Sequence, residues 1–310
     1  MELVRPKMQR EWGSAGVVNF VLGGMGAGYY LQSSLVIILQ TQGQIEPRSA
    51  AFKLLAPALV GLGFLALAME SSHIKSYLLD ARRILRSRHM LRYLRHSWMS
   101  RETLAAAIFC LAALLDWLLP HPVLWGLASV AAIGLILSHG FIIYRSVAVI
   151  AWHRPLIPLF FLTSAWVTGS GLALLVSSEM EGELAAAGLL CAALNVGVWL
   201  FYLYGSQDTA FCAATRTLRR PQSLWMALGI GHLLPMLLLL TLLLAGSYSQ
   251  TVLWRAIAAW AGLALMAGGA VQKSDLVRRA GYLRGIVMAK PERRAPEKQH
   301  PSIQRMAEKS

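Results

Sequence analysis

The sequence predicts an all-α membrane protein in which eight transmembrane helices form two four-helix bundles, with both termini in the cytoplasm. The 310 residues are 56% hydrophobic and 14% charged, whereas about a quarter of the residues of a soluble domain are usually charged. Eight apolar stretches have the length of a membrane span. The basic residues are concentrated on one side of these stretches, which indicates their orientation.

Eight segments reach the roughly 20 mostly apolar residues that a helix needs to cross the hydrocarbon layer. They lie at 13–40, 51–74, 103–119, 123–150, 155–178, 184–204, 223–245 and 252–271. Short connections with polar residues, Pro or Gly separate four pairs of segments: "TQGQIEPRS", "PHP", "SSEMEGE" and "AGSYSQ". These connections leave no room for a soluble domain, so we expect any chemistry to occur inside the membrane or on a partner.

The chain begins with a short arm, residues 1–12, whose basic residues precede an apolar stretch as they do in a secretion signal. The stretch at 13–40 is longer than the 7–15 apolar residues of such signals, and no small-residue cleavage site follows it. We therefore expect it to be retained as the first span. Within it, Gly24 and Gly28 have the GxxxG spacing that lets helices approach closely in lipid, which favours close packing among spans one to four.

Residues 13–150 form the predicted first bundle, with a long basic loop at 75–101. Leucines lie among the arginines of this loop, which fits either an amphipathic helix at the interface or a lipid-anchored loop. Residues 151–271 form the predicted second bundle, in which "LGIGHLLPMLLLL" indicates a kink in span seven. The alternative is that His232 lines a second polar pocket. The basic tail, residues 272–310, is polar and contains prolines, so we expect it to be disordered when free.

The basic residues orient the predicted spans. With eight spans, both termini share a side with the loops after spans two, four and six. Of the 29 Lys and Arg residues, 26 fall on that side, and Arg48, Lys53 and Arg255 fall on the other. The positive-inside rule makes the basic side cytoplasmic, here in the inner membrane of a prokaryote. The net charge of +14 then reflects topology, and we expect no nucleic-acid partner.

Polar residues of several spans are expected to meet near the cytoplasmic face. Ionisable residues inside spans are costly and therefore point to function. Glu70, His73 and Tyr77 follow i, i+3, i+7 spacing on one face of span two. Spans one, three and four bring further polar residues to the same depth: Asn19, Arg101, Glu102, His139 and Tyr144, with Arg145 just beyond. The opposite halves of these helices are nearly all apolar, so a single off-centre site is predicted.

A quinone suits such a site, because its ring is apolar, its two carbonyl oxygens need proton donors during reduction, and its isoprenoid tail is soluble in lipid. Histidine, carboxylate and tyrosine side chains can donate or relay protons. Five residues are expected to bind ubiquinone or menaquinone: Asn19, Glu70, His73, His139 and Tyr144. Four more are expected to support the site or a subunit interface: Tyr77, Arg101, Glu102 and Arg145.

Two rival functions stay open. A b-type haem needs axial histidines, which His73 and His139 could supply, while His232 is the only other imidazole well inside a span. A transporter needs polar groups across the whole membrane, but Asp116 and Asp208 leave a broad apolar gap between them. The three cysteines show no CxxC spacing. Two paired haems would need four such histidines, and an iron–sulfur cluster would need clustered thiolates, so our first expectation is that this chain holds neither.

Several segments resemble those of polysulfide-reductase or NrfD-type membrane subunits, including the membrane anchors of dimethyl-sulfoxide-reductase-type and sulfite-oxidising complexes. The similar segments are "FVLGGMGAGYYL", "SWMSRE", "AWHRPLIPLFFLTSAWVTGSGLALL", "GHLLPMLLLL" and "GGAVQKSDLVRRAGYLRGI". Their order and the eight-span count extend the resemblance over most of the chain.

The resemblance implies a membrane subunit that exchanges electrons between an iron–sulfur partner subunit and the quinone pool, within a complex whose catalytic subunit carries molybdopterin. Asn19 matches the family by its place in span one, and His73 lies where related anchors often have a histidine. Here "HIKSY" replaces the family's "HLGRP"-like continuation, and "SHGFIIY" departs from the tyrosine-bearing start of some relatives. Because the polar residues and the basic loops share the cytoplasmic side, we expect both partners to dock there.

Overall fold

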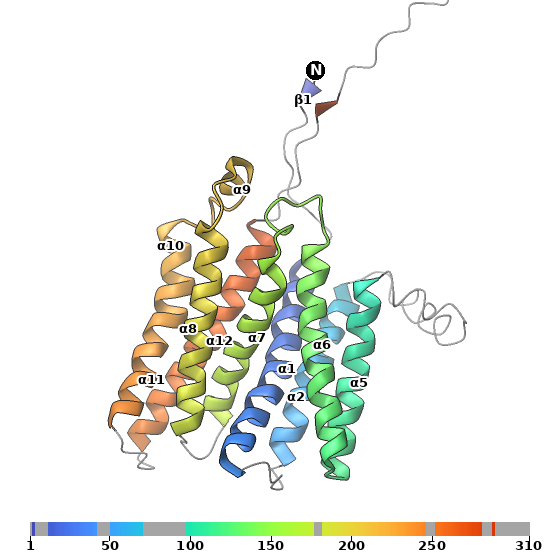
Figure 1. Cartoon of the computed structure of the whole chain (residues 1–310), viewed down its shortest axis with the longest axis vertical. Coiled ribbons are helices and arrows are strands. Elements are labelled where there is room, and N and C mark those ends of the chain that lie inside the picture. The colour runs from blue at the N-terminus through green and yellow to red at the C-terminus, as the bar shows by residue number, and fades with distance from the viewer. Residues whose placement is uncertain are drawn as a thin grey trace, which may run out of the picture.

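The computed structural model describes residues 2–3, 12–41, 50–70, 97–176, 182–245, 252–280 and 287–288. These ranges are helical apart from turns, connections and one antiparallel pair of two-residue strands, in which β1 (Glu2–Leu3) lies beside β2 (Val287–Met288). Glu2 is opposite Met288, and Leu3 is opposite Val287. The long helices lie side by side and run alternately up and down (Figure 1).

The first half of the chain contributes four long helices. Their bounds are α1 (Ser14–Thr41), α2 (Ala50–Glu70), α5 (Trp98–Leu118) and α6 (Pro122–Tyr144). The second half contributes four more long helices, one of which is composed of three consecutive helical segments. Their bounds are α7 (Leu156–Val176), α8 (Gly182–Tyr204), the continuous run of α10 (Pro221–Leu224), η1 (Trp225–Leu233) and α11 (Leu234–Ala245), and α12 (Val252–Arg278). A short helix, α9 (Thr209–Ala214), follows α8.

Six helices of the described ranges are long and apolar enough to cross a membrane. These are α5, α6, α7, α8, the composite helix from Pro221 to Ala245, and α12. A shorter apolar stretch, Leu54–Met69, lies within α2. The predictions of an all-α fold and of several transmembrane helices are thereby confirmed.

Local sequence explains where several helices begin. The Ser97 hydroxyl accepts a hydrogen bond from Ser100 N and caps α5, and His121 Nδ1 accepts one from Val123 N ahead of Pro122 in α6. Such side-chain acceptors satisfy backbone N–H groups that have no partner inside the first turn. The starts of α5 and α6 are therefore determined by the capping residues next to them, within otherwise apolar sequence.

Three helix ends differ from the prediction by five residues or more. The third span, predicted to begin at 103, begins at Trp98 in α5. The fourth span, predicted to reach residue 150, ends at Tyr144 in α6. The eighth, predicted to end at 271, continues to Arg278 in α12, where Gln272, Lys273 and Asp275 are buried. Hydropathy ends a predicted span at such polar residues, but packing against neighbouring helices keeps them in the helix. Lys273 is thus an interior residue and does not belong to the basic tail in which its sequence position placed it.

The helices pack in two groups that share a wide contact. In the first group, α1 contacts α2 and α6, and α5 contacts α2 and α6; in the second, α7 contacts α8 and α12, and the composite helix contacts α8 and α12. The two groups meet mainly where α1 packs along α7, with a further contact between α6 and α7. The helix α1 belongs to the first group and provides most of its contact with the second.

Glycines make the contact between α1 and α7 close. A Cβ atom at Gly28 would overlap the Ala165 carbonyl group of α7, and one at Gly169 would overlap the Gly28 backbone of α1. The GxxxG pair was expected to pack within spans one to four, whereas Gly28 faces α7 of the second half. Contact with α2 uses Gly26 instead, where a Cβ would lie 2.5 Å from Ala56 O.

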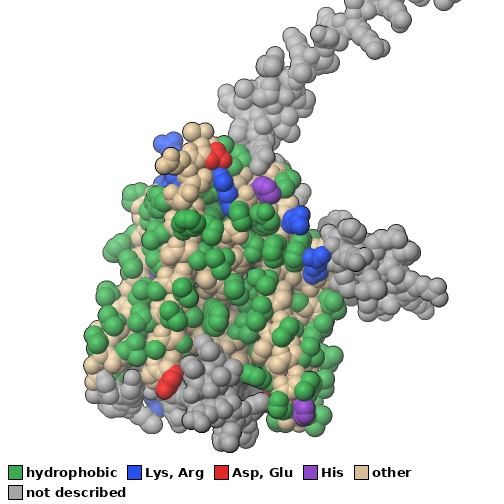
Figure 2. Space-filling view, in the orientation of Figure 1, with side chains coloured by type: hydrophobic (Ala, Val, Ile, Leu, Met, Phe, Trp, Pro, Cys, Tyr) green, Lys and Arg blue, Asp and Glu red, His purple; other side chains and the backbone are tan. Residues whose placement is uncertain are grey.

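The outer surface of the bundle is largely apolar, and its charges are near the ends. In Figure 2, hydrophobic side chains cover most of the visible face, and Lys and Arg side chains gather mainly toward its upper end. Exposed large hydrophobic residues occur on most long helices, among them Leu62, Leu111, Val130, Leu190 and Trp260. Such an outside is typical of a protein surrounded by lipid.

Candidate functional site

Three polar side chains meet between α1, α5 and α6. Asn19 Nδ2 of α1 donates a hydrogen bond to Glu102 Oε1 of α5 (2.7 Å). The same carboxylate oxygen lies 3.0 Å from His139 Nε2 of α6, close enough for an ion pair, although the angle is not that of a hydrogen bond. The relative exposures are 0% for Asn19, 2% for Glu102 and 0% for His139. We call these residues the Asn19–Glu102–His139 cluster.

The cluster lies near one end of the bundle. Asn19 is five residues after Ser14 at the start of α1, Glu102 is four residues after Trp98 at the start of α5, and His139 is five residues before the end of α6. At 1.5 Å per residue, all three are about 6–8 Å from their helix ends. The three helices have these ends on the same side of the bundle (Figure 1).

Glycines and aromatic rings shape the surroundings of the cluster. A Cβ at Gly23 would lie 3.0 Å from His139 Cε1, and one at Gly63 of α2 would lie 3.1 Å from Asn19 Oδ1. The His139 ring also lies 5.1 Å from the Phe20 ring, between centroids. Since a larger residue at either glycine would press on a polar side chain, these positions leave room for the cluster.

The cluster keeps unused hydrogen-bonding capacity. Within the described ranges, Asn19 Oδ1 and His139 Nδ1 are buried and have no hydrogen-bond partner. A buried polar atom without a partner costs free energy, so a bound ligand or water at these atoms would be favoured. Glu102 and His139 form the kind of acid–base pair that can hold and transfer a proton.

The other predicted site residues lie elsewhere or outside the described side chains. The Arg101 guanidinium lies over the Trp98 ring (4.1 Å to its centroid), the Tyr144 ring stacks on His153, and Arg145 is exposed. Glu70 ends α2. The Glu70 side chain and residues His73 and Tyr77 are not among the described parts of the chain, so their assignments stay predictions. Glu102, expected only to support the site, lies at its centre.

A second buried polar network lies in the second group of helices, and it includes His232, for which a second polar pocket was the alternative to a plain kink. Asn195 of α8 donates from Nδ2 to His232 Nε2 of η1 (2.8 Å) and to Gln272 Oε1 of α12 (2.7 Å). Asn195 Oδ1 accepts a hydrogen bond from the Thr163 hydroxyl of α7 (2.9 Å). One asparagine thus joins four helices.

The hydrogen bonds of His232 define its tautomer. His232 Nδ1 lies 2.6 Å from the Ala227 carbonyl oxygen, which can only accept, so Nδ1 carries the proton. His232 Nε2 is then the acceptor for Asn195. The residue lies in a π-helical stretch, a conformation that is frequent at functional sites. The predicted interruption of span seven is therefore a π-helix, and its His232 side chain is buried among the helices of the second group.

Polar side chains are also buried toward the opposite end of the bundle. The indole N–H of Trp166 donates to Gln32 Oε1 (2.8 Å), and that of Trp125 donates to Ser34 Oγ (3.0 Å). Asp116 is buried and accepts from His121 N. The prediction that these halves are nearly all apolar therefore needs correction. Hydropathy averages over a window hide single polar residues that pair across helices.

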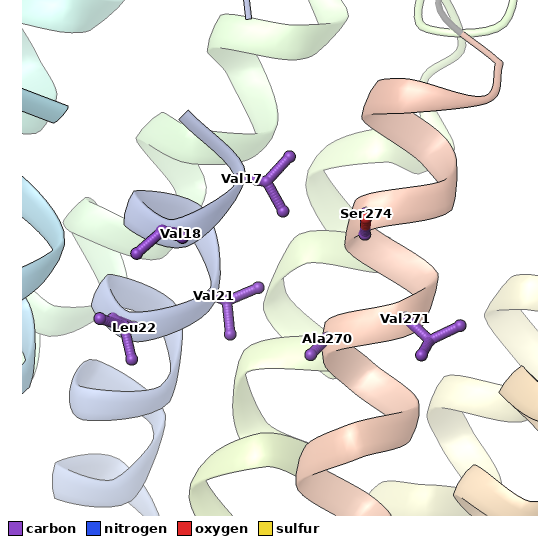
Figure 3. A pocket seen from close by; sticks show the side chains of 7 residues that line it. All are labelled: Val17, Val18, Val21, Leu22, Ala270, Val271 and Ser274. Carbon is purple, nitrogen blue, oxygen red and sulfur yellow. The ribbon is translucent and has the colours of Figure 1, made fainter. Parts of the chain in front are cut away.

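A groove between α1 and α12 lies on the outside of this arrangement. It has a volume of about 390 Å³ and is lined by Val17, Val18, Val21 and Leu22 of α1 and by Ala270, Val271 and Ser274 of α12. Val17 and Val21 point from α1 toward α12, and Ala270 points back (Figure 3). We call it the α1–α12 groove. Its walls are aliphatic apart from the Ser274 hydroxyl.

Metal-binding chemistry finds little support in the described part of the chain. There, no group of three or more His, Cys, Asp or Glu side chains is close enough to hold a metal ion. Cys110, Cys191 and Cys212 are all unpaired thiols on separate helices. They provide no thiolate cluster within these ranges.

Comparison with models of known protein families and with curated proteins finds no match. The resemblance to NrfD-type subunits therefore rests on the sequence segments quoted above. What the structure defines is a class: an all-α protein with the helices of a multi-pass membrane protein and with two buried polar networks.

Proposed function

We propose that this chain is the quinone-interacting membrane subunit of a multi-subunit redox complex. In this proposal, an iron–sulfur subunit exchanges electrons with a quinone at the chain, and a molybdopterin subunit carries out the substrate chemistry. The supporting observation is the Asn19–Glu102–His139 cluster, in which a buried carboxylate contacts an imidazole inside an apolar helix bundle. Reduction of a quinone to a quinol takes two electrons and two protons, and the cluster offers groups that exchange protons.

The proposed roles follow from the contacts of each side chain. Asn19 holds Glu102 through its amide, so the carboxylate oxygen stays beside His139 Nε2. The acid and the imidazole can share a proton, while His139 Nδ1 and Asn19 Oδ1 remain available to a ligand or water. Glu70, His73 and Tyr144 are proposed to extend the quinone site. Tyr77, Arg101 and Arg145 are proposed to support it or the partner interface.

The basic end of the bundle suits an acidic partner protein. Arg145, Arg216, Arg220, Arg278 and Arg279 are exposed at the end where the cluster lies. Under the positive-inside rule this end faces the cytoplasm. We therefore place both termini, the partner subunits and the quinone chemistry on the cytoplasmic side of a prokaryotic inner membrane, with α1 and α2 completing eight spans.

A transporter is the second candidate, and the network around Asn195 favours it. Together with Gln32 and Ser34, this network places buried polar groups at several depths, which a pathway for a solute or proton requires. The haem alternative is less well supported, because both ring nitrogens of His232 are engaged by protein atoms and His139 Nε2 faces Glu102.

Purification in mild detergent separates the two candidates. For the redox subunit, we expect an iron-containing cluster protein and extractable quinone to co-purify with the chain. A chain that purifies alone, without quinone, and that binds a soluble solute would overturn the redox proposal.

Substitution of Glu102 tests the site itself. Glu102→Gln keeps the shape and the contact with Asn19 but removes the proton-carrying group, so we expect quinone-coupled turnover of the complex to fall by about 10²-fold or more with assembly intact. Thr103→Val is the matched control, because Thr103 is the next residue of α5, is exposed, and bonds only locally to Met99 O. Equal turnover of both variants and the unmodified complex would remove the cluster from the mechanism.

A further inference from the structure

The α1–α12 groove opens on the apolar outside of the bundle. On its α1 wall, Val18 is 38% exposed and Leu22 is partly exposed. On its α12 wall, Val271 and Ser274 are partly exposed as well. A molecule that fills the groove therefore enters it from the surrounding lipid and contacts mainly aliphatic side chains.

The groove lies within one leaflet of the membrane. On α1 it runs from Val17 to Leu22, three to eight residues after the helix begins, and on α12 it runs from Ser274 back to Ala270, four to eight residues before the helix ends. Val17 and Ser274 lie at one end of the groove, and Leu22 and Ala270 lie further along it (Figure 3). At 1.5 Å per residue, both walls cover depths of about 4–12 Å from these helix ends. One leaflet contributes about 15 Å of hydrocarbon, so the groove follows the direction and depth of a lipid acyl chain.

A cationic side chain lies at the mouth of the groove. Arg278 comes four residues after Ser274 and seven after Val271, so all three share one face of α12. The Cα–Cβ bonds of a helix tilt toward its N-terminus, which for Arg278 is the direction of the groove. Arg278 is exposed. Among the described residues, Asp275 forms an ion pair with Arg279 (3.2 Å), and no acidic side chain pairs with Arg278.

We propose that the α1–α12 groove binds one acyl chain of an anionic phospholipid, whose phosphate is held by the Arg278 guanidinium. The aliphatic walls complement the hydrocarbon chain, and a guanidinium can bind phosphate oxygens through two parallel N–H groups. Ser274, one turn below Arg278, offers a hydroxyl to a phosphate or ester oxygen. Basic pockets between transmembrane helices on the cytoplasmic side are typical sites for anionic headgroups. The site does not depend on whether the chain is a redox subunit or a transporter.

A lipid in this groove would join the two groups of helices. The helix α1 belongs to the first group and α12 to the second, and their direct contact is smaller than that between α1 and α7. An acyl chain between them adds contacts to both helices. Because a ligand that binds only the folded state stabilises it, the bound phospholipid should raise the midpoint of thermal unfolding.

Lipid binding by the full-length chain in mild detergent tests the proposal. Dioleoyl phosphatidylglycerol is titrated, and the affinity of the first bound lipid is measured by native mass spectrometry. We expect Arg278→Gln to weaken this affinity about tenfold through loss of the charged hydrogen bonds, and Val21→Trp to weaken it by filling the groove. Dioleoyl phosphatidylcholine, which has the same chains but no net charge, should bind more weakly and be insensitive to Arg278→Gln.

Two matched variants control for the changes in charge and in size. Arg255→Gln removes an exposed arginine near the other end of α12, and Val130→Trp adds an indole at an exposed position of α6 outside the groove. Both should bind phosphatidylglycerol like the unmodified chain. If Arg255→Gln weakened binding as much as Arg278→Gln, the attraction would come from net charge and the site would be wrong. Equal affinities for the two lipids would also overturn the proposal.

Photo-crosslinking identifies the occupant in cells without any change to Arg278. With p-benzoylphenylalanine at Val18, on the exposed edge of the groove, irradiation should attach a phospholipid to the chain, detected by its mass after purification. Attachment to a protein instead would make the groove a docking site for a helix of a partner or of a second copy, and the lipid assignment would fail.

Discussion

At the scale of single residues, Asn195 is, within the described ranges, the buried polar side chain that joins the largest network of hydrogen bonds between helices. Its amide contacts His232, Gln272 and the Thr163 hydroxyl, which come from three other helices. Both amide hydrogens and the carbonyl oxygen are used. A side chain of similar size without these groups would leave several buried polar atoms unsatisfied.

Replacement of Asn195 by Leu should therefore destabilise the fold. We expect the free energy of unfolding to fall by about 1–3 kcal/mol, visible as a lower midpoint of thermal unfolding in detergent. Thr241→Val is the control, because the Thr241 hydroxyl is exposed and bonds only to Leu238 O in its own helix; it should leave the midpoint nearly unchanged. An Asn195→Leu protein as stable as the unmodified chain would mean that the network contributes nothing.

Sequence reasoning identified part of the buried polar chemistry. Asn19 and His139 were predicted to share a site because both lie at one depth in spans, and the structure places Glu102 between them. The second network has no local pattern, since Asn195 and Gln272 are isolated polar residues in different helices and their contact depends on tertiary packing. Their presence within apolar runs was the one available signal.

At the scale of elements, glycines decide which helices approach most closely. Gly28 and Gly169 bring the backbones of α1 and α7 together, and Gly231 and Gly268 do so for η1 and α12. Hydropathy located the helices to within a few residues, apart from the early start of α5, the early end of α6 and the late end of α12. It could not identify the helix that packs on the GxxxG face. The spacing shows that small residues share one face of α1, but it carries no information about the neighbouring helix.

A methyl group at Gly28 should disrupt the junction between the two groups of helices. Gly28→Ala places a Cβ into the Ala165 carbonyl group, and neither backbone can move without shifting a whole helix. We expect a loss of about 1–3 kcal/mol or more, measured by thermal unfolding in detergent.

Gly197→Ala in α8 is the matched control, because a Cβ there meets nothing within 4 Å. Alanine is favoured over glycine inside a helix by about 0.5–1 kcal/mol, so this variant should be slightly more stable than the unmodified chain. If both substitutions changed stability in the same direction and by the same amount, the close packing of α1 on α7 would not be a stabilising feature.

At the scale of the whole molecule, charge is distributed unevenly between the two ends of the bundle. Among the described residues, Arg145, Arg154 and Arg216 lie at the end that carries α9, whereas Arg255 lies near the start of α12 at the other end. The few acidic groups near the basic end are partly neutralised, as Asp208 pairs with Arg154 (2.9 Å). The positive-inside rule turns this difference into a prediction of orientation.

Cysteine labelling in intact cells checks that orientation. In a background with the native cysteines replaced by alanine, a single cysteine at Gln207, beside α9, should react with a membrane-impermeant maleimide only after the cells are lysed. A single cysteine at Leu119, in the connection between α5 and α6, should react in intact cells, because it is exposed at the opposite end. The reverse pattern would place the basic end, and with it the Asn19–Glu102–His139 cluster, on the outer side. A cytoplasmic iron–sulfur partner could not then dock beside the cluster.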